Sequence, residues 1–298
     1  MNDLQEEFDS LVAKTEWSDG VGRRDFIKVA LGSGFAAAVL PVCAQTMIKT
    51  DTDGLSVGQF NLMVDGQAVP VYRAQPQGNT GDKHSLPVIL VISEIFGVHE
   101  HIADVARRFA KLGYLALAPD LFVRQGDPSK YKTIAELQQA VISKVPDAQV
   151  MQDLDALMAW AGSNGGNTGK LGITGFCWGG RIVWMYAAHN PQIKAGVAWY
   201  GRLVGEPTAL KPKNPVDIAA TLKTPVLGLY GARDSGIPVS TVAAMQDALG
   251  KAHNPSEFVL YPDAGHAFHA DYRPSYVEAD AKDGWRRCIA WFKAHGVA

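Results

Sequence analysis

One cysteine lies in a glycine-flanked turn, Gly175-Phe176-Cys177-Trp178-Gly179, between an apolar stretch and a segment with helical spacing. This arrangement is typical of a nucleophile elbow, a sharp strand-to-helix turn that exposes one reactive side chain. Glycines on both sides let the strand and the helix approach each other, because glycine has no Cβ. We therefore predict that Cys177 is a nucleophile, with sulfur in the place that serine oxygen usually takes.

A thiol nucleophile requires a base, and the base requires a group that orients it. Asp234 and His266 are the candidates, because each comes directly after a predicted strand. The chain order of nucleophile, acid and histidine is the order found in α/β hydrolases. We predict a triad of Cys177, Asp234 and His266. The alternative, a tight turn with a buried thiol, a helix-capping aspartate and a structural histidine, requires three coincidences.

The tetrahedral intermediate of acyl transfer carries an oxyanion, which two backbone donors must stabilise. At a nucleophile elbow one donor is the residue after the nucleophile, and the other lies in the loop after the first central strand. In this chain these positions are Trp178 and the loop Ser93-Glu94-Ile95-Phe96-Gly97. We predict that the N–H groups of Ile95 and Trp178 form the oxyanion hole.

Two patterns predict the elements that position these residues. Strand-like runs at 59–64 and 68–73 flank Asp65-Gly66, a hairpin-turn signal, and predict an N-terminal antiparallel hairpin. From residue 87 onwards, continuously apolar runs alternate with helical spacing, which predicts a mostly parallel central sheet with helices on both faces. The predicted fold class is α/β, of the α/β-hydrolase type. Ligand groups in such sheets lie at the carboxyl ends of the strands.

From residue 57 to the C-terminus the chain resembles the dienelactone hydrolase family. The resemblance implies an enzyme whose Cys-Asp-His triad, here Cys177, Asp234 and His266, hydrolyses small unsaturated lactones through an acyl-thiol intermediate. The segments that carry it are Glu94-Ile95-Phe96-Gly97, Tyr114-Leu115-Ala116-Leu117-Ala118-Pro119-Asp120-Leu121-Phe122, Gly175-Phe176-Cys177-Trp178-Gly179-Gly180, Tyr200-Gly201 and Ala264-Gly265-His266-Ala267-Phe268.

The resemblance also implies roles for residues outside the triad. The glutamate that matches Glu94 interacts with the thiol in family members and protects it until substrate enters; a carboxylate that helps to start the following helix is the alternative. Arg124 matches an arginine that binds the substrate carboxylate, and a solvated loop arginine is its alternative. The second carboxylate-binding arginine of the family has no direct counterpart, because Ala270 stands there. Arg273 is the candidate substitute.

Other ring-bearing residues stand near the predicted strand ends. Tyr200 is expected to contact substrate, with a core position as the alternative. His99 and His101 have a His-x-His spacing, but no third ligand set accompanies them, so we predict no metal site. His269 is expected to be an exposed loop histidine. The predicted thiol chemistry requires no cofactor.

The first 44 residues resemble a twin-arginine export signal. Arg23-Arg24 precede a charge-free run at 29–40, which is too short to span a bilayer because spanning needs about 20 apolar residues. An amphipathic helix is the alternative, and lipidation at Cys43 is not expected. We predict export through the twin-arginine machinery to the periplasm or beyond. The predicted organisation is a signal segment at 1–44, a linker at 45–56 and one hydrolase domain at 57–298.

Composition limits the partners. The 298 residues are 47% hydrophobic and 19% charged, with a formal net charge of -2, which gives no reason to expect a nucleic-acid partner. No stable membrane insertion is expected either. We predict a cysteine-nucleophile hydrolase of lactones or activated esters. The alternatives are a general carboxylesterase or thioesterase on the same scaffold, and a non-catalytic binding or redox-sensing protein.

Overall fold

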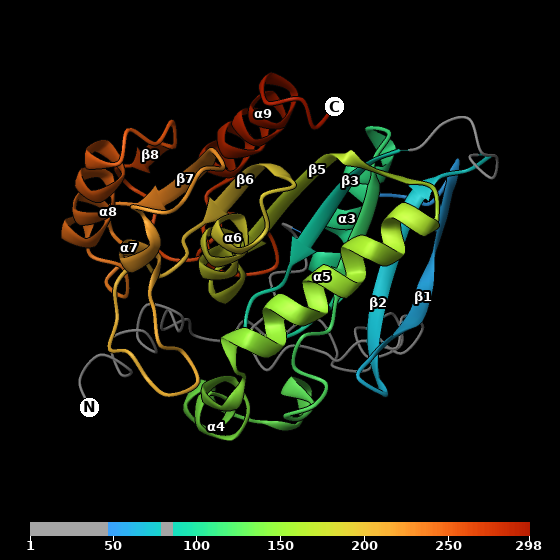
Figure 1. Ribbon diagram of the computed structural model, residues 1–298, viewed down its shortest axis with the longest axis horizontal. Coiled ribbons are helices and arrows are strands. Elements are labelled where there is room, and N and C mark those ends of the chain that lie inside the picture. Colours follow the sequence, from blue (N-terminus) through green and yellow to red (C-terminus); the bar gives the residue numbers. More distant parts are fainter. Residues whose placement is uncertain (1–46, 79–85) are drawn as a thin grey trace, which may run out of the picture.

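The computed structural model describes residues 47–78 and 86–298, so the predicted signal segment lies outside the described residues. Within these ranges eight strands form one mixed sheet, in the order β1-β2-β4-β3-β5-β6-β7-β8 (Figure 1). The pairs β1–β2 and β2–β4 are antiparallel, and all others are parallel. The strands are β1 (Leu55–Val64), β2 (Gln67–Pro76), β3 (Leu86–Ile92), β4 (Leu115–Pro119), β5 (Gly166–Phe176), β6 (Ile193–Trp199), β7 (Val226–Gly231) and β8 (Glu257–Tyr261).

The predicted N-terminal hairpin is confirmed. Strands β1 and β2 pair along their whole length, and Val64 lies opposite Gln67. The two turn residues, Asp65 and Gly66, have φ values of 49° and 77°. Two consecutive positive φ values match the right-handed twist of the flanking strands, and Asp-Gly adopts them readily. The hairpin extends the parallel sheet on the side away from β8.

Helices cover both faces of the sheet, as predicted. Helices α3 (Glu100–Lys111) and α9 (Glu278–Ala294) meet on one face, where Phe109 packs against Trp285 and Phe292. Helices α5 (Asp147–Ser163) and α6 (Trp178–His189) cover the other face (Figure 1). Because both faces are covered, the central strands are almost entirely buried, which explains their continuously apolar sequences. In the described part of the chain, no helix is long and apolar enough to cross a membrane.

Four short helices and one longer helix complete the described part of the fold, and the first of them is the 3-10 helix η1 (Pro128–Lys130). Helix α4 (Ile134–Ala140) and the 3-10 helix η2 (Ile142–Lys144) lie between β4 and α5, beyond the carboxyl ends of the strands (Figure 1). Helix α7 (Pro215–Ile218) precedes β7, and α8 (Val239–Lys251) connects β7 to β8. The segment between β6 and α7 forms a long irregular crossover. This crossover and α4 therefore lie over the carboxyl ends of the strands, where the predicted site residues are.

The first turn of α6 approaches the backbone of its neighbours closely. A Cβ on Gly179 would lie 2.4 Å from the carbonyl oxygen of Ile92, at the end of β3. A Cβ on Gly201, just after β6, would lie 2.3 Å from the carbonyl carbon of Gly180. Both clashes involve backbone atoms, which cannot move aside as a flexible side chain can. Glycine at these positions allows β3, β6 and α6 to meet directly beneath Cys177.

We expect Gly201→Ala to destabilise the protein strongly, because the added methyl must displace the backbone of α6. A loss of about 3 kcal/mol in the free energy of unfolding is the expected size. Denaturant titration measures it. Gly250→Ala in α8 is the matched control, since a Cβ there meets nothing within 4 Å, and it should be neutral or stabilising. Equal stability of the two variants would contradict the close-approach explanation.

Candidate active site

Cys177 occupies a strained turn between β5 and α6. Its φ is 53° and its ψ is -115°, an unusual backbone conformation that costs a non-glycine residue about 1–3 kcal/mol. The turn is anchored because the Cys177 N–H donates a hydrogen bond of 3.0 Å to the carbonyl oxygen of Trp199. The side chain is 7% exposed and lines a cavity. The strain therefore serves to present one sulfur atom at the carboxyl end of the sheet.

Asp234 and His266 come from the loops after β7 and β8, and the structure joins them. The Nδ1–H of His266 donates to Asp234 Oδ2 over 2.7 Å, and both side chains are almost fully buried. The other oxygen of Asp234 accepts the backbone N–H groups of Gly236 and Ile237 at 3.0 and 3.1 Å. Because these bonds fix the carboxylate, the proton of neutral His266 stays on Nδ1. The Nε2 atom is then left with its lone pair available.

The electrostatics of His266 suit a group that accepts a proton from a thiol. Burial disfavours the charged imidazolium, but the negative charges of Asp234 and of ionised Cys177 outweigh it and raise the pKa of His266 well above its usual value. Its Nε2 atom is buried and has no hydrogen-bond partner among the residues described. His266 can therefore hold a proton taken up at Nε2.

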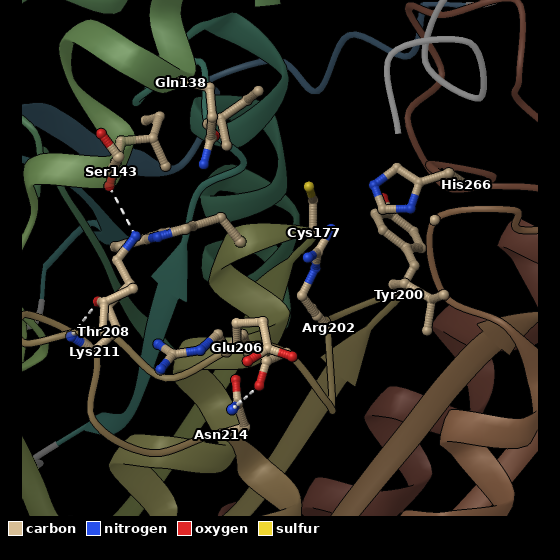
Figure 2. Close-up of a pocket in the computed structure, with 17 residues that line it drawn as sticks. Gln138, Ser143, Cys177, Tyr200, Arg202, Glu206, Thr208, Lys211, Asn214 and His266 are labelled. Carbon is tan, nitrogen blue, oxygen red and sulfur yellow. Dashed lines mark hydrogen bonds between the residues drawn. The ribbon is translucent and has the colours of Figure 1, made fainter. Parts of the chain in front are cut away.

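Cys177 and His266 line one cavity of about 240 Å³. Figure 2 shows Cys177, Tyr200 and His266 on one side of it and Gln138, Ser143 and Lys211 on the other. The remaining walls come from α4, η2 and the crossover between β6 and α7. Within the described ranges, the buried Trp178 Nε1 and Tyr200 Oη atoms that border the cavity have no hydrogen-bond partner. Buried polar atoms without partners are uncommon, so these walls are suited to a polar ligand.

The two expected oxyanion donors lie at this cavity. Trp178 is the first residue of α6, and an N–H at that position has no acceptor within its own helix. The helix dipole adds partial positive charge at the same point. Ile95 lies in the loop after β3, which turns sharply at Gly97 with a φ of 72°. Both residues border the cavity that Cys177 also lines, which is where a pair of oxyanion donors would have to lie.

Glu94 lies behind the cavity wall and is 1% exposed. Its Oε2 accepts a hydrogen bond of 2.7 Å from the Tyr272 hydroxyl, and its Oε1 has no partner among the described residues. Burial favours the neutral acid, but the positive charge of Arg273 and the neighbouring groups lower the pKa of Glu94 below its usual value. Glu94 is therefore a buried, charged carboxylate. The alternative expectation, a carboxylate that helps to start the following helix, would have placed it in contact with solvent.

The structure does not bring Arg124 to the cavity. Its guanidinium makes two parallel bonds to Asp153 in α5, at 2.6 and 2.8 Å, and it is not among the lining residues. Arg273 is also absent from the lining; it is 2% exposed and its guanidinium carbon lies 5.5 Å above the centre of the Phe96 ring. The two arginines expected to bind a substrate carboxylate thus have other neighbours in this structure.

Three cationic residues that the sequence analysis did not select line the cavity instead: Arg181, Arg202 and Lys211. Arg181 makes two bonds to Asp147, at 2.8 and 2.7 Å, and so ties α6 to the start of α5. Lys211 Nζ donates to the carbonyl oxygen of Ile142 over 2.8 Å. The only signal for Arg202 in the sequence is its position just after a predicted strand, and Arg181 and Lys211 carry no local signal at all.

The histidines near the site are packed within the protein. His269 is 2% exposed and its ring lies 5.0 Å from Phe176 and 4.4 Å from Trp199, so the expectation of an exposed loop histidine was wrong. The chain turns inward after His266, which a local sequence pattern does not reveal. His99 and His101 are buried as well. Among the residues that the structure describes, no group of three or more His, Cys, Asp or Glu could hold a metal ion.

A family model and closely similar curated relatives point to the same protein family. The family model described as "Dienelactone hydrolase family" matches residues 69–296. A protein named "Putative carboxymethylenebutenolidase" from Methylorubrum extorquens is 58% identical over 290 residues, covering 97% of this chain and 97% of the relative. A protein of the same name from Escherichia coli is 52% identical over 264 residues, covering 89% of this chain and 96% of the relative.

Solved structures agree with this result. The crystal structure titled "Putative Dienelactone Hydrolase" from Klebsiella pneumoniae superposes with a TM-score of 0.78 at 55% identity, covering 80% of this chain and 98% of that chain. A dienelactone hydrolase-like enzyme from metagenomic libraries shares the fold, with a TM-score of 0.67 at 21% identity. The predicted α/β-hydrolase fold is thereby confirmed. This chain belongs to the dienelactone hydrolase family, and it is a hydrolase.

Proposed function

We propose that this protein hydrolyses small lactones or activated esters through an acyl-thiol intermediate on Cys177. The observation that carries the proposal is the convergence of three groups: Cys177 and His266 line one cavity, and Asp234 holds the far nitrogen of His266 at 2.7 Å. The relatives named as carboxymethylenebutenolidases support a lactone as the substrate class. No cofactor takes part in the proposed reaction.

In this mechanism Nε2 of His266 accepts the thiol proton, and the Cys177 sulfur attacks the carbonyl carbon. The N–H groups of Trp178 and Ile95 stabilise the negative oxygen of the tetrahedral intermediate. His266 then returns the proton to the leaving oxygen as the carbon–oxygen bond breaks. In the second half, His266 takes a proton from water, the hydroxide attacks the thioester, and the sulfur leaves.

A sulfur nucleophile limits the range of esters that the enzyme can hydrolyse. A thiolate leaves a tetrahedral intermediate more readily than an ordinary alkoxide does, so with a poor ester the intermediate returns to reactants. An enol lactone or another activated ester has a stable leaving oxygen and can proceed. In the resting enzyme, the buried carboxylate of Glu94 controls the thiol before substrate enters. Such control would limit thiol oxidation in an exported protein.

We also propose that the substrate carries an anionic group. Arg181, Arg202 and Lys211 give the cavity wall positive charge, against the single carboxylate of Glu206. Arg181 is paired with the carboxylate of Asp147, whereas Lys211 donates to the carbonyl oxygen of Ile142 and Arg202 directly follows β6 at the cavity. Arg202 and Lys211 are the proposed anion-recognising residues. Arg124 and Arg273 lie outside the cavity lining, which does not favour that role for them.

Cys177→Ala should abolish hydrolysis of a panel of lactones and nitrophenyl esters, lowering kcat by at least about 10³-fold, because no other group can form the acyl intermediate. Intact-mass measurement with a slow substrate should show one acyl adduct on the wild type and none on the variant. Cys288→Ala is the matched control, since Cys288 is buried in α9 away from the cavity, and it should keep its turnover. Full activity of Cys177→Ala would disprove the proposed nucleophile.

Arg202→Gln should lower kcat/KM for an anionic ester by about 10- to 100-fold and leave a neutral ester of the same shape nearly unchanged, because one charge-assisted hydrogen bond is lost. Steady-state kinetics on the paired esters measures this preference. Lys213→Gln, on an exposed side chain in the same crossover, is the control and should show no change. If Arg124→Gln alone changes the preference, the anion site lies at Arg124. If no variant changes it, the enzyme is a general esterase.

We further propose that the protein is exported by the twin-arginine route, on the basis of Arg23-Arg24 and the charge-free run that follows. Replacing both arginines with lysine should leave the enzyme in the cytoplasm, because that machinery recognises the arginine pair. Fractionation of cells that express the full chain, followed by an esterase assay of each fraction, measures the outcome. Lys14→Gln, a change of charge outside the pair, serves as the control. Unchanged periplasmic activity of the double-lysine variant would exclude this route.

A further inference from the structure

A buried polar cluster lies behind the cavity and takes no part in the proton transfers described above. It consists of Glu94, His99, His101, Asp271 and Tyr272, each of which is at most 5% exposed. These residues come from the loop after β3, the start of α3 and the loop after β8. The cluster therefore connects three segments, one of which carries His266.

Tyr272 is the member that contacts Glu94. Its hydroxyl donates to Glu94 Oε2 over 2.7 Å and lies 3.4 Å from Nε2 of His99. Burial lowers the pKa of His99 to about 3, so this ring is neutral under ordinary conditions. Since the tyrosine hydroxyl donates its hydrogen to Glu94, its oxygen is free to accept a hydrogen bond from the tautomer of His99 that is protonated on Nε2. In that tautomer the hydrogen bonds run from His99 through Tyr272 to Glu94.

The position of Tyr272 is itself fixed by its neighbour Asp271. Asp271 Oδ1 lies 3.1 Å from Nδ1 of His101, and Oδ2 accepts a bond of 2.6 Å from Arg108. Both partners belong to α3, which is packed against the sheet. The tyrosine ring also lies 4.9 Å from the His99 ring and 5.2 Å from the His101 ring. These contacts fix the ring of Tyr272 and so hold its hydroxyl group in place next to Glu94.

The bond from Tyr272 leaves the two oxygens of Glu94 unequal. Oε2 has a donor at 2.7 Å, whereas the buried Oε1 has none among the described residues. Glu94 and Cys177 follow neighbouring strands, because β3 pairs with β5 and Ile92 lies opposite Gly175. Ile95, the residue after Glu94, lines the same cavity as Cys177. The titratable and charged groups that face Glu94 are Arg273, His101, His99, Tyr272 and Tyr200.

We propose that Tyr272 is a positioning residue that holds Glu94 by one oxygen, keeps the carboxylate ionised and directs the other oxygen to the Cys177 thiol. Tyr272 thereby sets the pH range in which Glu94 controls the reactivity of the thiol. This inference rests on the proposed function, in which Cys177 is the nucleophile. It assigns a role to a residue that lies outside the triad and the oxyanion hole.

The test is the pH dependence of Cys177 alkylation by iodoacetamide, followed by intact mass. The inflection due to Glu94 is identified as the one that disappears in Glu94→Gln. A hydrogen bond to a carboxylate favours its charged form and lowers its pKa, so removing the bond raises the pKa. In Tyr272→Phe, which keeps the ring, the Glu94 inflection should therefore move up by about one pH unit. Reversion of this variant to tyrosine should return the inflection to its wild-type pH.

Two further variants separate this role from a structural one. In the double variant of Glu94→Gln and Tyr272→Phe, the profile should match that of Glu94→Gln alone, because Tyr272 acts through Glu94. Tyr186→Phe is the matched control: it also removes a tyrosine bond to a carboxylate, that of Asp155 at 3.0 Å, but far from the cavity, and its profile should equal the wild type. Thermal unfolding verifies that each variant is folded.

Three results would each overturn the inference. The first is an inflection that does not move in Tyr272→Phe, and the second is additive effects in the double variant. The third is that Glu94→Gln removes no inflection from the wild-type profile. Failure of the proposed function appears elsewhere, as ester turnover that survives Cys177→Ala. If turnover depends on Cys177 while Tyr272→Phe leaves the profile unchanged, then only the role of Tyr272 is wrong.

Discussion

The site depends on the backbone contact between the first turn of α6 and the ends of its neighbouring strands. Gly179 packs against the carbonyl oxygen of Ile92, and Gly201 packs against Gly180, with no room for a Cβ at either point. This contact holds Cys177 in a positive-φ turn that costs about 1–3 kcal/mol and would relax without support. The same contact places the N-terminus of α6 beside the loop that carries Ile95. The proposed nucleophile and the proposed oxyanion donors are therefore positioned by one packing arrangement.

Electrostatics then give two buried carboxylates different tasks. Asp234 accepts two backbone N–H groups and the Nδ1–H of His266, so its charge is compensated locally and it raises the pKa of the histidine. Glu94 has one hydroxyl donor and the nearby charge of Arg273, and it keeps one oxygen without a partner in the described part of the protein. The first carboxylate can only orient its partner, whereas the second can still accept a proton or a hydrogen bond. Burial alone would favour the neutral form of Glu94.

The sequence analysis predicted the features that depend on chain order and local pattern. The strand and helix alternation, the Asp65-Gly66 hairpin and the strand-end positions of Cys177, Asp234 and His266 all follow from periodicity and turn chemistry. Contacts between distant segments could not be predicted in this way. The partner of Arg124 is Asp153, in the second turn of α5, and no local signal links them. For the same reason His269 was expected in solvent, although tertiary packing buries it against Phe176.

Much of the cavity wall is built by segments that carry no residue of the predicted triad. Residues that contact the substrate can therefore differ from those that react with it. The crossover after β6 is held to the α4–α5 region by backbone and side-chain bonds: Asp147 N–H donates to Leu210, Lys211 to Ile142, and Arg181 bridges Asp147 and the carbonyl of Lys213. These bonds hold Lys211 at the cavity, whereas Arg202 directly follows Gly201, which packs against the first turn of α6. A change of charge at Lys211 would therefore alter the cavity wall without altering the packing that holds Cys177. We therefore propose that residues at the strand ends carry out the reaction and that the crossover contributes to the choice of substrate.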